Sequence, residues 1–203
     1  MIKENKMKNK FWISLGGVLS TTVAVPLLAA SCGKTESQSR VKLVATSTEL
    51  ANQTVPNKNN DNRATYKDLL FDESEVKLEF TNTKINDDIL TSKKDNGLQV
   101  FFNSYNNVVA LYGTKKTPEQ KPWEAPKIAT ISGLDSYLLT NDKEPIYIKK
   151  DKKKPDKHYL NNNGYLNVTK NDAGKYVVKF RLFKKEAKGA VSISTQIYEM
   201  VLN

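Results

Sequence analysis

The chain of 203 residues contains one cysteine, Cys32, and one histidine, His158. A lone cysteine cannot form an intramolecular disulfide, so burial of apolar side chains must hold the fold together. A lone histidine cannot build a histidine-rich metal site, and no Gly-x-Ser-x-Gly motif accompanies it. The sequence also lacks a phosphate-binding glycine loop and a dinucleotide-binding fingerprint. We therefore expect a protein that is not an enzyme, with no cofactor and no metal site.

Residues 11–30 contain no charged side chain, although charged residues make up 27% of the whole sequence. Four lysines and one acid precede this apolar segment, and small residues and Cys32 follow it. This is the order of a secretory signal peptide, with a cationic start, an apolar middle and a small-residue cleavage site. An uncleaved membrane anchor is the alternative, because about 20 apolar residues can cross a bilayer. Gly16, Gly17 and Pro26 would weaken such a helix.

The sequence Leu28-Ala29-Ala30-Ser31-Cys32 resembles a bacterial lipobox, with alanine at position 29 where that motif usually has leucine. In lipoproteins of this kind the cysteine thiol is lipidated and becomes the first residue of the mature protein. The resemblance implies a lipoprotein signal peptide over residues 1–31 and palmitate-type acyl chains on Cys32. Two acyl chains hold a protein stably on a membrane, whereas one holds it only marginally. We expect the protein on the extracellular face of the cell membrane.

Arginine is scarce: lysine supplies 29 of the 32 basic residues, and the formal net charge is +10. Lysine and asparagine, whose codons are rich in A and T, are favoured throughout the chain. Together with the lipobox, this composition resembles that of surface lipoproteins of mollicutes, the wall-less bacteria such as mycoplasmas and ureaplasmas. The resemblance implies a domain that faces the host directly.

Two segments have the composition of flexible linkers or loops. Residues 33–40 are small and polar, as expected of a flexible tether, and residues 53–63 combine a proline with a run of asparagines. Residues 41–45 between them are either an edge strand or more linker. We divide the chain into the signal peptide, the lipidated cysteine with its tether (residues 32–64), and an extracellular β-rich domain (residues 65–203).

From residue 64 onward, short apolar runs alternate with turn residues, which is typical of an all-β, mainly antiparallel domain. The pattern predicts strands at residues 75–80, 127–132, 145–148, 164–169, 175–183 and 190–202. Residues 98–112 are ambiguous, because their apolar spacing is helical but their asparagines and aromatic residues disfavour a helix. They form either a helix or a hairpin of residues 98–102 and 108–112.

Asp172, Gly174 and Tyr176 follow a strand that ends in Leu-x-Val-Thr. This arrangement resembles the E-to-F corner of immunoglobulin-like domains, and it implies a β-sandwich with a buried tyrosine hydroxyl at the corner. No earlier segment supplies the first cysteine of that family. The alternative is an ordinary hairpin turn in another β fold.

The most basic segment, residues 149–157, includes Lys152, Lys153 and Lys154. It is either a solvated loop or a docking site for polyanions such as host glycosaminoglycans. No aromatic residue alternates with the lysines to stack on bases, so we expect no specific nucleic-acid binding.

Trp123 lies in a proline-rich segment, residues 118–126. It either packs on the sheet or is an exposed anchor for a partner, a role in which tryptophan is enriched.

These features predict a non-catalytic surface lipoprotein that acts by display and binding, as a surface antigen or adhesin-like protein. Its partner would be a host extracellular protein or a polyanionic glycan, in addition to the membrane that the lipid on Cys32 enters. The alternative is a solute-binding lipoprotein of a transporter, although the chain is short for a two-lobed capture protein.

Overall fold

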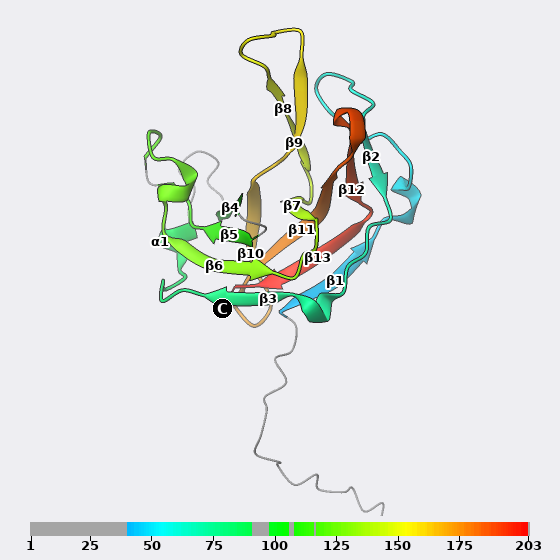
Figure 1. Ribbon diagram of the computed structural model, residues 1–203. Helices are drawn as coiled ribbons and strands as arrows, with labels where there is room; N and C mark the ends of the chain where they lie inside the picture. Colours follow the sequence, from blue (N-terminus) through cyan, green and yellow to red (C-terminus); the bar gives the residue numbers. More distant parts are fainter. Residues whose placement is uncertain (1–39, 91–97, 106–107, 116, 203) are drawn as a thin grey trace, which may run out of the picture. The chain divides into compact units, whose positions relative to one another are not determined.

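The structure is a computed structural model, and it describes residues 40–90, 98–105, 108–115 and 117–202 (Figure 1). Cys32 and the predicted signal peptide and lipobox lie outside the described residues. Within the described ranges, no helix is both long and apolar enough to span a membrane.

The described residues form thirteen strands and five short helical segments. The strands are β1 (Val41–Thr46), β2 (Ala64–Lys67), β3 (Lys77–Phe80), β4 (Gln99–Tyr105), β5 (Val108–Tyr112), β6 (Lys127–Ser132), β7 (Leu138–Asn141), β8 (Ile146–Lys150), β9 (His158–Asn162), β10 (Tyr165–Lys170), β11 (Tyr176–Lys185), β12 (Val191–Ser194) and β13 (Gln196–Val201). The helical segments are η1 (Thr48–Leu50), η2 (Glu73–Glu75), α1 (Asp87–Leu90), η3 (Pro122–Glu124) and η4 (Ala187–Gly189). The all-β prediction is confirmed.

Eleven strands belong to one curled sheet, and β8 and β9 pair separately (Figure 1). The main path through the sheet runs β1-β13-β11-β10-β4-β5-β6-β3. Its pairs are antiparallel, whereas β12 and β2 pair in parallel beside this path.

Strand β10 joins the two halves of the curled sheet. Its first half, residues 165–167, pairs with β4, and its second half, residues 168–170, pairs with β11. Both halves contribute side chains to the same apolar core. The structure therefore refines the expected sandwich: the two walls around the core are parts of one continuous sheet.

Strand β11 lies at the centre of this core. Its inward residues Val178, Phe180 and Leu182 are at most 1% exposed, as their alternation predicts. The ring of Phe180 stacks on Tyr198 of β13, with 5.8 Å between ring centroids. Burying each such side chain contributes roughly 1.5 to 3 kcal/mol.

The ambiguous residues 98–112 form a hairpin of β4 and β5. Phe102 pairs with Leu111 and Ser104 with Val109, so the larger apolar side chains share the inner face. The hairpin alternative is confirmed, although β4 is longer than expected. Its β-branched and aromatic residues favour a strand over the weak helical spacing.

The last predicted strand, residues 190–202, is two strands that separate at Thr195. The Ser194 hydroxyl accepts the Leu182 N–H at 2.8 Å and donates to the Gln196 carbonyl at 2.7 Å. These side-chain bonds redirect the chain, so β12 pairs with β2 while β13 pairs with β1 and β11.

The folded unit includes residues 41–64, which were expected to belong to the tether. Strand β1 pairs with β13, so the edge-strand interpretation of residues 41–45 is confirmed. Farther along, Val55 and Ala64 are completely buried.

The segment that resembles an immunoglobulin corner forms a hairpin turn between β10 and β11. Val168 pairs with Val178 and Lys170 with Tyr176, so both strands lie in one sheet. Asp172 and Gly174 are exposed in the turn, and Gly174 has a φ of +72°. The Tyr176 hydroxyl donates to the Asp87 carboxylate at 2.7 Å, whereas the corner motif satisfies a backbone group. The ordinary hairpin alternative describes this turn, because a corner would send the two strands to different sheets.

Candidate functional site

Strands β8 and β9 form a hairpin that projects from the curled sheet (Figure 1). Directly opposed residues of an antiparallel pair share a face. On the inner face, Leu160 packs with Phe183 and Ile193 in a second, smaller apolar cluster. The outer face carries Tyr147, Lys149, Tyr159 and Asn161, and both tyrosines are 49% exposed. We call this outer face, together with the turn of residues 151–157, the hairpin surface.

Polar side chains fix the base of the hairpin to β7. The buried Thr140 hydroxyl donates to the Pro145 carbonyl and accepts the Asn163 N–H. The Asn162 side chain donates to the Leu139 carbonyl at 3.1 Å. These bonds stabilise the two points where the hairpin enters and leaves the sheet, because each satisfies a backbone group that would otherwise need water.

A charged cluster ties the far end of β9 to the loop before β2. Asp61 forms an ion pair with Arg63 at 2.7 Å and contacts the His158 ring nitrogen Nε2 at 2.5 Å. The Asp61 side chain is only 7% exposed. Hydrogen bonds from Arg63, the largest influence, outweigh desolvation and hold the pKa of Asp61 far below its usual range. The carboxylate therefore stays ionised and joins two segments nearly a hundred residues apart.

The turn at the tip of the hairpin is built around Asp151. Its carboxylate accepts the backbone N–H groups of Lys153 and Lys154 and the Tyr159 hydroxyl, at 2.8, 3.2 and 2.9 Å. These hydrogen bonds, the one from Lys153 first among them, lower the pKa of Asp151. The turn is thus an ordered structure.

Lys152, Lys153 and Lys154 are exposed side by side at this tip. Within the residues that the structure describes, no ion pair involves any of the three. The hairpin therefore presents cations whose charges are not neutralised by a neighbouring carboxylate at close range.

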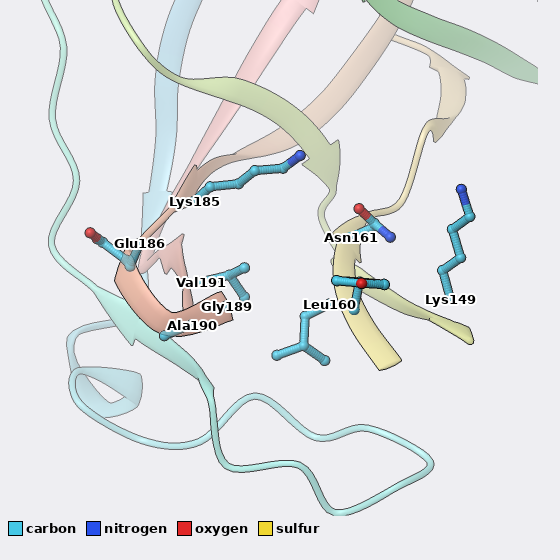
Figure 2. Close-up of a pocket in the computed structure, with 9 residues that line it drawn as sticks. Lys149, Leu160, Asn161, Lys185, Glu186, Gly189, Ala190 and Val191 are labelled. Atoms are coloured by element: carbon cyan, nitrogen blue, oxygen red, sulfur yellow. The ribbon is translucent and has the colours of Figure 1, made fainter. Parts of the chain in front are cut away.

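Two shallow grooves flank the hairpin. The η4 groove, about 240 Å³, lies between the hairpin and the β11–β12 connection, and its lining includes Lys149, Lys185 and Ala190 (Figure 2). Tyr159 also lines this groove. The β4 groove, about 360 Å³, lies between the hairpin base and β4, and Tyr147 forms part of its lining. The outer face of the hairpin thus contributes to both grooves.

Trp123 does not join the lysines at the hairpin tip. It belongs to η3, where its side chain is 52% exposed and the Lys121 ammonium lies 5.7 Å from the ring centroid. Neither groove has Trp123 in its lining. The structure therefore separates the two sequence-predicted binding features.

Residues that sequence reasoning missed hold the hairpin in place. Asp61 and Asn163 lie in asparagine-rich runs that predict turns, and both are indeed next to turns, but their side chains anchor the hairpin. His158, for which the sequence predicts no role, begins β9. No local signal identifies partners this distant in sequence.

In the described part of the chain, no group of three or more histidine, cysteine, aspartate or glutamate side chains is arranged to hold a metal ion. The arrangement that the structure does provide is an ordered, cationic hairpin with exposed aromatic rings, which suits binding.

Comparison with known proteins adds one finding. Residues 50–203 match the family model described as Mycoplasma P30 protein, and this range contains the whole hairpin surface. No curated protein and no solved structure matches the chain.

Proposed function

Because the chain belongs to the Mycoplasma P30 protein family, we propose that it is a lipid-anchored, adhesin-like surface protein that binds host polyanions through its hairpin surface. The family membership confirms the interpretation of the sequence as that of a mycoplasma surface protein. The proposal adds a lipid on Cys32 and a non-catalytic binding role.

The observation that carries the binding role is the lysine tip of the hairpin. Lys152, Lys153 and Lys154 are adjacent, exposed and outside any ion pair in the described ranges. Asp151 is engaged by the turn backbone and Tyr159, so it holds the loop in shape. A cluster of cations on an ordered turn attracts sulfate and carboxylate groups of glycans and releases their counterions on binding.

Heparin chromatography tests this role with the full chain in detergent micelles. We expect the triple variant Lys152→Ala, Lys153→Ala, Lys154→Ala to elute at clearly lower salt than the unchanged chain. The matched control is Lys77→Ala, Lys127→Ala, Lys179→Ala, which removes the same charge from exposed positions on strands of the sheet. Equal decreases in elution salt for both variants would mean that net charge alone governs retention, which would contradict a role for the tip. Absence of retention of the unchanged chain would also overturn the proposal.

Radiolabelled palmitate tests the anchor separately. We expect the unchanged chain to incorporate label and Cys32→Ser to lose it, because the thiol is the only one in the chain. Equal labelling of the two chains would rule out lipidation at this position.

A further inference from the structure

The η4 groove combines an apolar floor with a lysine on each side, and nothing in the sequence indicates it. We propose that it binds one acidic sugar residue, carboxylated or sulfated, of a glycan whose remaining length lies along the hairpin toward its lysine tip. This inference rests on the proposed function and names the ligand class of the same surface.

One wall of the groove is the tight connection between β11 and β12. Glu186 and Ala190 close this connection with a backbone hydrogen bond of 2.9 Å, and Lys188 and Gly189 both have positive φ. A Cβ atom at position 189 would lie 3.0 Å from Nη1 of Arg63, in a conformation that side chains rarely adopt. This wall is therefore a tight backbone turn next to the guanidinium of Arg63, which is itself held by its ion pair with Asp61.

The opposite wall is the hairpin itself. Leu160 is buried in the smaller apolar cluster, which fixes the position of β9. Tyr159 is held by its hydrogen bond to Asp151, so its ring does not rotate freely. Both walls are thus positioned before any ligand arrives, which reduces the entropy that binding costs.

The charges around the groove favour an anion. Figure 2 shows Lys185 and Lys149 on opposite sides of the groove, with Glu186 directed away from the hairpin. Glu186 accepts the Ser192 hydroxyl at 2.8 Å and forms an ion pair with Lys67 at 3.9 Å. The other nearby carboxylate, Asp151, is engaged within the turn, and Lys149 is close enough for its charge to help lower the pKa of Asp151. Lys149 and Lys185 are the cations that line the groove, and an ammonium binds carboxylate or sulfate by charge-assisted hydrogen bonds.

The size and chemistry of the groove match a single sugar ring. A volume of about 240 Å³ is too small for most drug-sized ligands. Ala190 and the exposed ring of Tyr159 offer an apolar surface for the C–H face of a ring, above the buried Leu160 and Val191, while Asn161 offers an amide to its hydroxyl groups. Because Lys149 precedes the tip lysines on the same hairpin, a longer polyanion continues from the groove to the tip.

The test is an NMR titration of the full chain in detergent micelles with a sulfated, uronate-containing heparin disaccharide. A neutral disaccharide, lactose, is the ligand control. We expect the heparin disaccharide to shift the backbone amide signals of Asn161 and Gly189, and lactose to leave them in place. The double variant Lys149→Gln, Lys185→Gln should bind the heparin disaccharide with roughly tenfold lower affinity. Ala190→Leu, which fills the groove, should abolish the shifts while the thermal melt stays within a few degrees.

Two matched variants separate this inference from the proposed function. Lys77→Gln with Lys179→Gln removes the same charge elsewhere and should leave disaccharide affinity within twofold. The tip variant Lys152→Ala, Lys153→Ala, Lys154→Ala should also keep disaccharide affinity while losing retention on long heparin. Absent shifts in the unchanged chain, or equal weakening by both glutamine pairs, would overturn the groove inference even if long heparin is retained. If the unchanged chain were not retained on long heparin at all, that result would instead overturn the proposed function.

Discussion

The curled sheet and the β8–β9 hairpin depend to different degrees on apolar burial and on polar contacts. The sheet surrounds a core of apolar side chains, many of them completely buried, contributed by both of its halves. The hairpin contributes Leu160 to the smaller apolar cluster, and it is also held by the Asp61 cluster at one end and the Thr140 bonds at the other. Apolar burial thus dominates in the body, whereas the hairpin combines a small apolar contact with a few directional ones. This difference allows the hairpin to present tyrosines and lysines to solvent without weakening the core.

Phe180→Ala is the most severe test of the body. The side chain is 1% exposed and stacks on Tyr198, so its removal leaves a cavity at the centre of β11. We expect a loss of about 3 to 5 kcal/mol in the free energy of unfolding, measured by urea denaturation. A loss below about 1 kcal/mol would show that the body does not depend on this core.

Asp61→Asn tests the hairpin by the same measure. The substitution removes the charge that Arg63 and His158 contact, and we expect a loss of roughly 1.5 to 3 kcal/mol. Hydrogen exchange should accelerate mainly in β8 and β9 and less in β11, because the contact anchors the hairpin and not the core. The control is Asp72→Asn, whose carboxylate accepts hydrogen bonds from the backbone N–H and the hydroxyl of Ser74, two residues away. Uniform acceleration across the sheet would mean that hairpin and body open as one unit.

Acid titration sharpens this contrast further. The pKa of Asp61 lies below its ordinary value of 3.8 in the folded chain, so the unfolded chain binds a proton at higher pH than the folded one. The stabilisation by Asp61 is therefore complete above about pH 5 and is lost as the pH falls through 3.8 toward the folded pKa. We expect urea midpoints to fall more steeply with acid in the unchanged chain than in Asp61→Asn. Identical slopes would contradict the role of the ionised carboxylate.

Trp123→Ala should have the smallest effect on stability. Although tryptophan is the largest side chain, Trp123 is half exposed in η3. We therefore expect the free energy of unfolding to change by no more than about 0.5 kcal/mol. Because the structure separates Trp123 from the lysine tip, heparin retention should also be unchanged. A large drop in the melting temperature would indicate that the indole packs on the sheet.

The sequence predicted the body much better than the hairpin anchors. Alternation in residues 175–183 correctly identified Val178, Phe180 and Leu182 as core residues, although Val177 and Phe183 on the other face of β11 are buried as well. The split at Thr195 was missed, since it depends on the Ser194 hydroxyl bonding Leu182 across the sheet. The basic tip was visible as a run of lysines, but the η4 groove was not.

The groove arises where two connections distant in sequence come together. Lys185 is the last residue of β11, Ala190 lies in the connection that follows, and Tyr159 belongs to β9, so only the folded chain places them around one space. The contact of His158 with Asp61 has the same origin. Periodicity reports which way a side chain faces, whereas it carries no information on which distant segment it meets.

The pairing of β1 with β13 also sets the order of events when the protein is made. Val41 pairs with Met200, so the first described strand finds its partner only after nearly all of the described chain has been synthesised. Until then β1 has no neighbouring strand with which to pair, and its residues Leu43 and Val44 are exposed even in the folded protein. Such long-range pairing slows folding. An unfinished chain therefore stays unfolded at this edge until β13 has been made.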